Sequence, residues 1–65
     1  MKILVNGVEQ DVAAQTLEGA LERLDYADTK VATALNGDFV PARRRAETPL
    51  REGDRIEIVA PRQGG

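Results

Sequence analysis

The sequence predicts a small α+β domain in which one helix covers one face of a mixed β-sheet. Three observations support this prediction: the chain has only 65 residues, it carries one apolar stripe with helical spacing, and short β-rich segments lie on both sides of that stripe. A chain of this length can form one domain with one compact core. One helix packed on one sheet is the economical way to build such a core.

The first half of the chain predicts a hairpin followed by a helix. Residues 2–5 are β-rich and reach Asn6-Gly7, a strong signal for a tight turn, so residues 8–12 are expected to return antiparallel. Thr16 is a suitable helix N-cap. Apolar residues then recur with the spacing of one amphipathic helix, at Leu17, Ala20, Leu21 and Leu24.

The segment after the helix predicts a second pair of strands. Residues 31–35 are β-rich and end at Asn36-Gly37, a second turn signal. Phe39-Val40 forms a short returning strand that Pro41 ends. The sequence leaves the register of the first of these strands open, because either Val31 and Leu35 or the alanines between them can face the helix.

The last strand is expected at residues 55–59, with Ile56 and Ile58 on one face, and the polar residues 42–49 before it are expected to be irregular. A hairpin, a crossover helix and a late strand placed beside the first strand describe the β-grasp, or ubiquitin-like, roll. We expect this domain to span residues 1–60. A flexible tail should follow over 61–65, because its proline lacks a donor for the strand ladder and nothing apolar follows.

The composition argues against side-chain catalysis. The chain contains no Cys, His, Ser or Trp, whereas His is the commonest general base, and Ser and Cys are the usual nucleophiles. A Ser-His-Asp triad, a Cys-His pair and a zinc site of Cys and His ligands are therefore excluded. Asp25, Asp28, Asp38 and Asp54 are scattered over predicted turns, which gives a carboxylate metal site little support. We expect no catalytic residues, no metal and no bound cofactor.

The charge and hydropathy pattern indicates a cytoplasmic protein. Nine Lys and Arg residues against eleven Asp and Glu residues give a net charge of −2, which provides no strong attraction to nucleic acid or to an anionic membrane. The longest apolar runs have three residues, far fewer than the roughly 20 of a membrane helix. The first residues also turn polar too soon for a secretory signal.

The chemical interest of the sequence lies at its end. Two glycines, Gly64 and Gly65, stand last, and a chance pair there has a probability of only about 0.5%. Without Cβ atoms such a terminus can enter a narrow channel. A carboxylate is a poor acyl donor until AMP transfer from ATP gives a mixed anhydride that a sulfur or nitrogen nucleophile can attack. The terminal carboxylate is therefore the expected reactive group.

Several segments together make the sequence resemble a known family. They are the MKILVNG opening, the Thr16-Leu17 helix start, the run from Leu35-Asn36-Gly37 to Val40-Pro41, the turn Gly53-Asp54 with RIEIV, and Gly64-Gly65. Over essentially the whole chain, these resemble the ThiS family of sulfur carriers of bacterial thiamin biosynthesis.

The resemblance implies a cycle of reactions at Gly65. An adenylating enzyme of the ubiquitin-activating type (ThiF) uses ATP to activate the Gly65 carboxylate. Sulfur derived from cysteine then converts it to a thiocarboxylate, which thiazole synthase (ThiG) uses as its sulfur source. ATP would thus be a substrate of the partner enzyme rather than a ligand of this chain.

Partner docking is expected to involve exposed residues outside the core. The candidates are Phe39, Arg43, Arg44, Arg45 and Arg62. Phe39 can be either a core residue or an exposed anchor, and the three consecutive arginines are interpreted as a docking patch that contributes little to the fold. Two positions depart from the family pattern: Ala42 stands where an Arg is common, and Arg45 where an aromatic residue is common.

Two other functions remain open at this point. The chain can be a related diglycine carrier with another client, such as a small subunit of molybdopterin synthase or a ubiquitin-like modifier. It can also be a β-grasp interaction domain whose two terminal glycines have no chemistry. The VPxxxxxxxxLxEGDxIEIV arrangement resembles the ThiS family better than the longer molybdopterin synthase subunits.

Overall fold

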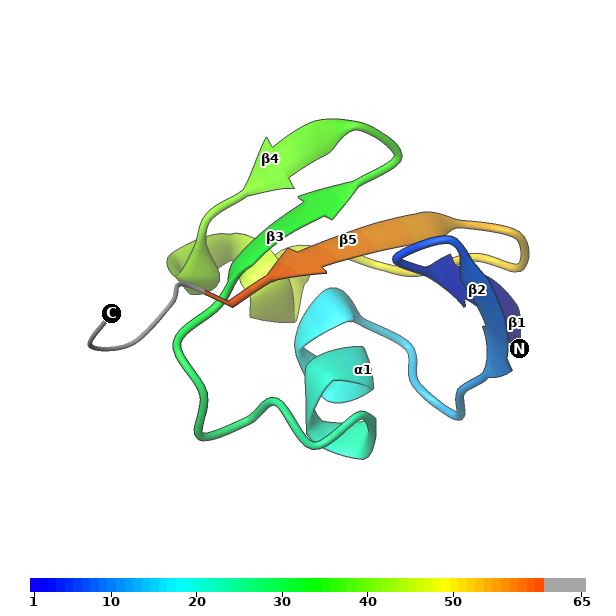
Figure 1. Ribbon diagram of the computed structural model, residues 1–65, viewed down its shortest axis with the longest axis horizontal. Coiled ribbons are helices and arrows are strands. Elements are labelled where there is room, and N and C mark those ends of the chain that lie inside the picture. Colours follow the sequence, from blue (N-terminus) through cyan, green and yellow to red (C-terminus); the bar gives the residue numbers. More distant parts are fainter. Residues whose placement is uncertain (61–65) are drawn as a thin grey trace.

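The computed structural model describes residues 1–60, in which a five-stranded sheet packs against a short helix (Figure 1). In chain order the elements are β1 Lys2–Val5, β2 Val8–Asp11, α1 Leu17–Arg23, β3 Ala32–Leu35, β4 Asp38–Val40, the 3-10 helix η1 Ala42–Glu47 and β5 Arg55–Val59. The strands lie in the order β2-β1-β5-β3-β4. This arrangement confirms the predicted β-grasp fold. The tail predicted at 61–65 lies outside the described residues.

β5 lies in the middle of the sheet although it is the last strand of the chain (Figure 1). It pairs in parallel with β1, where Leu4 lies opposite Arg55 and Val5 opposite Ile56. On its other side it pairs antiparallel with β3. A parallel neighbour requires a crossover connection, and the segment that contains α1 supplies it. β5 therefore has a bonded neighbour along both edges.

The core lies between the sheet and α1. Among residues 1–60, ten hydrophobic residues are buried there: Ile3, Val5, Val12, Leu17, Ala20, Leu21, Val40, Leu50, Ile56 and Ile58. β1 and β5 each contribute every second residue, as the two-residue period of a strand requires. The predicted helix stripe is confirmed, although its last member, Leu24, is only half-buried at the edge of the core.

Both ends of α1 have defined caps. The Thr16 hydroxyl oxygen accepts a hydrogen bond from the Gly19 amide at 3.1 Å, as predicted for an N-cap. At the other end Asp25 has a positive φ of 69°, and the Tyr26 amide donates to the Leu21 carbonyl at 2.8 Å. This is the bonding pattern of a Schellman motif, which usually has glycine at the position of Asp25. The caps hold a helix of only seven residues.

The structure settles the register of β3. Thr33 is 2% exposed and lies opposite Val40 of β4 and Ile58 of β5. Since neighbours on paired strands share a face, Thr33 points into the core together with these two residues. Val31 and Leu35 are therefore on the side of the helix, and the alanines of β3 lie on the opposite face of the sheet.

The segment after β4 differs from the sequence prediction. Residues 42–49 were expected to be irregular, but Ala42–Glu47 form the 3-10 helix η1. It begins directly after Pro41, whose carbonyl accepts from the Arg44 amide at 2.9 Å. Pro41 is the N-cap, with an extended backbone (φ −68°, ψ 158°), and its missing N–H removes no hydrogen bond from the helix. The polar composition concealed this turn, since a 3-10 helix this short needs no amphipathic period.

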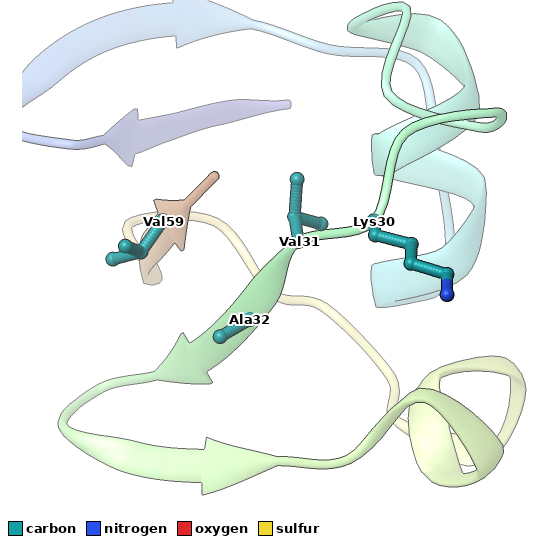
Figure 2. Close-up of a pocket in the computed structure, with 4 residues that line it drawn as sticks. All are labelled: Lys30, Val31, Ala32 and Val59. Atoms are coloured by element: carbon teal, nitrogen blue, oxygen red, sulfur yellow. The ribbon is translucent and has the colours of Figure 1, made fainter. Parts of the chain in front are cut away.

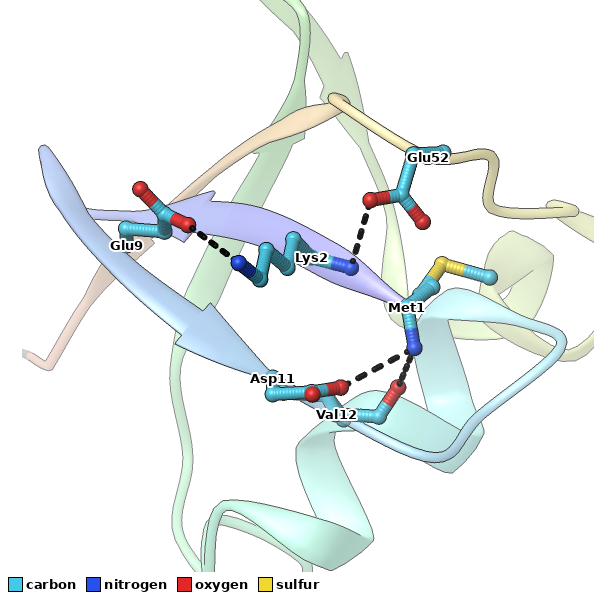
Figure 3. A network of polar contacts seen from close by, with 6 residues as sticks. All are labelled: Met1, Lys2, Glu9, Asp11, Val12 and Glu52. Carbon is cyan, nitrogen blue, oxygen red and sulfur yellow. Dashed lines mark hydrogen bonds and ion pairs between the residues drawn. The ribbon is translucent and has the colours of Figure 1, made fainter.

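Charged groups join the start of the chain to its neighbours in the sheet (Figure 3). The Met1 ammonium lies 3.1 Å from an Asp11 carboxylate oxygen and 3.2 Å from the Val12 carbonyl. Lys2 pairs with Glu9 at 3.7 Å, and its amide donates to Glu52 at 3.2 Å. The Lys2 and Glu9 side chains are largely exposed, so this ion pair contributes little to stability.

Candidate functional site

The expected reactive group itself lies outside the described residues. Gly64 and Gly65, together with Arg62, belong to the segment 61–65. What the structure describes is the strand that leads to them. The described part of the candidate site is therefore the end of β5 and the surface that surrounds it.

The end of β5 is held on both sides. Val59 lies opposite Ala32 of β3 in the antiparallel ladder. On the other side, the Asn6 side chain binds both backbone groups of Ile58, with N···O distances of 2.8 and 3.0 Å. The chain therefore leaves the sheet from a strand whose last residues have hydrogen-bond partners on two sides.

A largely uncovered apolar surface lies beside this strand end, and we call it the open face. It comprises the residues of β3, β4 and β5 that point away from α1: Ala32, Ala34, Phe39, Arg55, Glu57 and Val59. Phe39 is 69% exposed and Val59 is 63% exposed. Of the two possibilities for Phe39, the structure therefore shows the exposed one. Ala34 lies between Phe39 and Glu57 in the register, so these strands form one continuous surface.

A shallow pocket marks the border of the open face next to the strand end (Figure 2). It has a volume of about 320 Å³ and is lined by Lys30, Val31, Ala32 and Val59. The Lys30 side chain extends away from the other three residues (Figure 2). The lining is apolar, and exposed apolar surface rimmed by charge is typical of a protein contact site.

The predicted arginine patch is divided by the structure. Arg43 and Arg44 are exposed on η1, and Arg44 pairs with Glu47 at 3.9 Å. Arg45 is half-buried instead, and its guanidinium donates to the Thr33 hydroxyl at 3.0 Å and to the Val31 carbonyl at 2.6 Å.

The structure therefore contradicts the expectation that all three arginines are exposed, while the contribution of Arg45 to stability stays a prediction. A forked guanidinium has the donors to satisfy two acceptors at once, and here it joins η1 to β3. The alternation along β3 and β4 places Thr33 and Phe39 on opposite faces of the sheet. The arginine segment and the open face are thus separate surfaces, and docking by Arg43 and Arg44 stays a prediction.

Residues 1–60 contain neither a metal-binding cluster nor a membrane-spanning helix. Among residues 1–60, no group of three or more His, Cys, Asp or Glu side chains is arranged to hold a metal ion. Within the same range, no helix has the length and apolar character needed to cross a membrane. What the geometry shows is an exposed apolar surface next to the end of β5.

Sequence reasoning missed two parts of this site. Val59 points to the same outer side of β5 as Arg55 and Glu57. An apolar residue among these outward positions was a signal that the outer side of the strand carries apolar surface. Asn6 was interpreted only as a turn residue. Its contact with Ile58 spans 52 positions in the sequence, and no local pattern predicts a pairing over that separation.

Comparisons with known proteins agree with the fold and show the family of the chain. The family model described as "ThiS family" matches residues 3–65. A thiazole synthase of Paramagnetospirillum magneticum is 38% identical over 66 aligned positions, which cover 100% of this chain and 20% of that protein. The sulfur carrier protein ThiS of Thermus thermophilus is 33% identical over 63 positions, covering 97% of this chain and 98% of the relative.

A solved structure supports the same assignment. The crystal structure of a thiamine biosynthesis protein (ThiS) from Geobacter metallireducens superposes with a TM-score of 0.80 at 29% identity, and each chain is covered completely. The chain spans about a fifth of the thiazole synthase but nearly all of the carrier protein. Because the family model covers almost every position from the first strand to the two terminal glycines, this chain belongs to the ThiS family.

Proposed function

We propose that this chain is a sulfur carrier protein of thiamin biosynthesis, and that the Gly65 carboxylate is the group that carries the sulfur. The observation that supports this most directly is the family match, which extends through Gly65. A carrier of nearly the same length, from Thermus thermophilus, is among the relatives. In this function the chain is the substrate of other enzymes and not a catalyst.

The proposed reaction has two steps at one carbon atom. A Gly65 carboxylate oxygen attacks the α-phosphorus of ATP in a ThiF-like adenylating enzyme, pyrophosphate leaves, and an acyl adenylate forms. A sulfur nucleophile then attacks the carbonyl carbon, and AMP leaves. With hydrosulfide the product is the thiocarboxylate directly. With a protein persulfide an acyl disulfide forms first, and a thiol reductant releases the thiocarboxylate.

The domain supplies a fixed origin for the reacting terminus. An enzyme that binds the domain places the end of β5 at a set distance from its own active site, and the six residues 60–65 then lead to the carboxylate. Positioning of this kind converts a bimolecular reaction into an effectively intramolecular one. Glycine at positions 64 and 65 suits a narrow channel, because it has no Cβ to collide with the channel wall.

We further propose that the open face binds thiazole synthase, the enzyme that takes the sulfur. This partner is favoured because a segment 38% identical to this chain occurs within a protein named thiazole synthase. Exposed aromatic and aliphatic side chains such as Phe39 and Val59 are suitable anchors for a protein interface.

The carrier function is tested by intact mass spectrometry after incubation with ATP, a ThiF-like enzyme and hydrosulfide. Wild-type protein should gain the mass of one oxygen-for-sulfur exchange and should then support thiazole formation by thiazole synthase. Deletion of Gly65 should abolish the exchange, since small displacements of a reacting group are costly. Gly64→Val should reduce it strongly, because the β-branched side chain adds bulk next to the reacting group.

Both variants should unfold at the wild-type temperature, because they change no buried residue of the domain. If the Gly65 deletion acquires sulfur as fast as wild type, the terminal carboxylate is not the carrier group. If wild type acquires sulfur but thiazole synthase does not use it, the chain is a carrier for another client.

A further inference from the structure

Asn6 forms a pair of hydrogen bonds that strand pairing does not account for. Its side-chain oxygen accepts from the Ile58 amide at 2.8 Å, and its side-chain nitrogen donates to the Ile58 carbonyl at 3.0 Å. Ile58 stands two positions before Ala60, the last described residue. A single side chain therefore satisfies both backbone groups of a residue at the end of β5.

The strand pairing explains why these two groups need a partner. The Leu4 amide donates to the Asp54 carbonyl and the Asn6 amide donates to the Ile56 carbonyl, each at 2.9 Å. Alternate residues of this segment therefore face β1, and Ile58 is the next in the series. β1 has no residue left to pair with it, because the chain turns away at Asn6. The Asn6 side chain extends the ladder by one step in place of a backbone.

The chemistry of asparagine fits this role closely. A primary amide has one acceptor and one donor side by side, as a peptide group does. Asn6 also has a positive φ of 52°, a conformation that asparagine adopts more readily than most residues. Aspartate at this position would keep the acceptor but would face the Ile58 carbonyl with an oxygen instead of a donor.

We propose that Asn6 is a positioning residue for the terminal carboxylate: it fixes the last residues of β5 and hence the point from which the terminal segment starts. This inference rests on the proposed function, because positioning matters only if Gly65 reacts in a partner enzyme. Loss of the Asn6 amide should let the strand end open on its β1 side. The carboxylate then reaches the reactive position in a smaller fraction of complexes, which lowers the rate of activation.

The fold contains a matched control at the other end of the same strand. Asn36 has a φ of 51° and precedes Gly37, just as Asn6 precedes Gly7. Its side-chain oxygen accepts from the Arg55 amide at 2.9 Å. Asn36→Gly and Asn6→Gly each remove a side-chain acceptor from a backbone amide of β5, although the Asn36 side-chain nitrogen donates to the Asp54 carboxylate at 3.0 Å, and Gly-Gly is compatible with both turns. Only Asn6 lies next to the end that leads to Gly65.

The first measurement is amide hydrogen exchange on the protein alone, followed residue by residue by NMR. In Asn6→Gly the Ile58 amide should lose about tenfold or more of its protection, because its acceptor is gone. In Asn36→Gly the protection of Ile58 should match wild type. Equal protection of Ile58 in Asn6→Gly and wild type would show that the side chain does not hold the strand end, and would overturn the proposal.

The second measurement is the steady-state rate of adenylation by a ThiF-like enzyme, well below the unfolding temperature of every variant. Asn6→Gly should lower kcat about tenfold with little change in KM, because the docking surface is intact and only the geometry of the terminus has changed. Asn36→Gly should keep both constants. Asn6→Asp, which preserves the size of the side chain, should not restore kcat.

The outcomes separate this inference from the proposed function. Equal kcat for the two glycine variants would overturn a positioning role for Asn6, whatever their stabilities. If wild type itself is not adenylated by a competent cognate enzyme, the proposed function fails, and the positioning role fails with it. In that case the exchange result still decides whether Asn6 holds the strand end.

Discussion

The two faces of β5 differ sharply although they belong to one strand of five residues. Ile56 and Ile58, which point toward α1, are 1% and 6% exposed, whereas Val59 on the open face is 63% exposed. All three are branched aliphatic residues, so composition alone does not distinguish them. The difference is in what covers them: α1 covers the first face, and no described element covers the second. The inner face therefore stabilises the domain, and the outer face is available to a partner.

The largest effect should come from a cavity on the inner face. Ile56→Ala should lower the free energy of unfolding by about 2–5 kcal/mol, because the buried methyl groups lose their contacts. A domain of this size has only about 3–10 kcal/mol in total. Val59→Ala on the same strand should change it by less than about 0.5 kcal/mol. Urea unfolding followed by circular dichroism measures both, and equal losses would contradict the difference between the faces.

The inner face is also the part that the sequence predicts best. The period of two in RIEIV and the helical spacing of Leu17, Ala20 and Leu21 are local signals, and they led to the correct elements and core. The register of β3 was left open because Val, Ala and Leu give no decisive alternation. In the structure Thr33 is the residue of β3 that faces the core, where its hydroxyl donates to the Val40 carbonyl at 2.7 Å. Such a partner is set by tertiary structure and not by spacing.

A second loss of unfolding free energy, smaller than that of Ile56→Ala, is expected where Arg45 of η1 contacts β3. Arg45→Ala should lower the free energy of unfolding by about 1–2 kcal/mol, since hydrogen bonds from a charged group to the Thr33 hydroxyl and Val31 carbonyl are lost. Thr33 keeps its bond to Val40, which limits the loss. Arg44→Ala is the control, because Arg44 is exposed. Thermal unfolding of the two variants should differ by several degrees, and identical curves would show that the Arg45 contacts are not stabilising.

The arginines show why the site was harder to predict than the core. Three identical residues in a row carry no signal that one of them turns inward. The 3-10 turn of η1 determines which side chain reaches β3, and that turn depends on the preceding proline and on packing against α1. The two terminal glycines, by contrast, drew attention through sequence alone, because their proposed role follows from their position in the sequence.

A third prediction concerns binding by the open face. Phe39→Asp should leave the free energy of unfolding nearly unchanged, because the side chain is 69% exposed. It should weaken binding to thiazole synthase by about tenfold or more, as removal of an aromatic anchor does.

Val8→Asp provides the control for this measurement. Val8 is also largely exposed, at 61%, but it lies on the edge strand β2 opposite Val5, whose side chain faces the core. Isothermal titration calorimetry should give wild-type affinity for Val8→Asp. If both variants bind equally well, the open face is not the docking surface for this enzyme.

The smallest effect is expected for the exposed charges of η1. In the double variant Arg43→Ala/Arg44→Ala, the free energy of unfolding should change by less than about 1 kcal/mol, because exposed ion pairs such as Arg44 with Glu47 contribute little.

Binding of the double variant to the adenylating enzyme should respond differently from folding. Two positive charges on a net acidic protein can steer it toward an acidic surface of the adenylating enzyme, which raises the association rate at low salt. Stopped-flow association rates should therefore be lower for the double variant at low ionic strength and should converge with wild type as salt screens the interaction. Arg45 is left unchanged in this variant, so that a loss of stability is not mistaken for a loss of steering. Equal association rates at every salt concentration would show that the arginines of η1 have no part in docking.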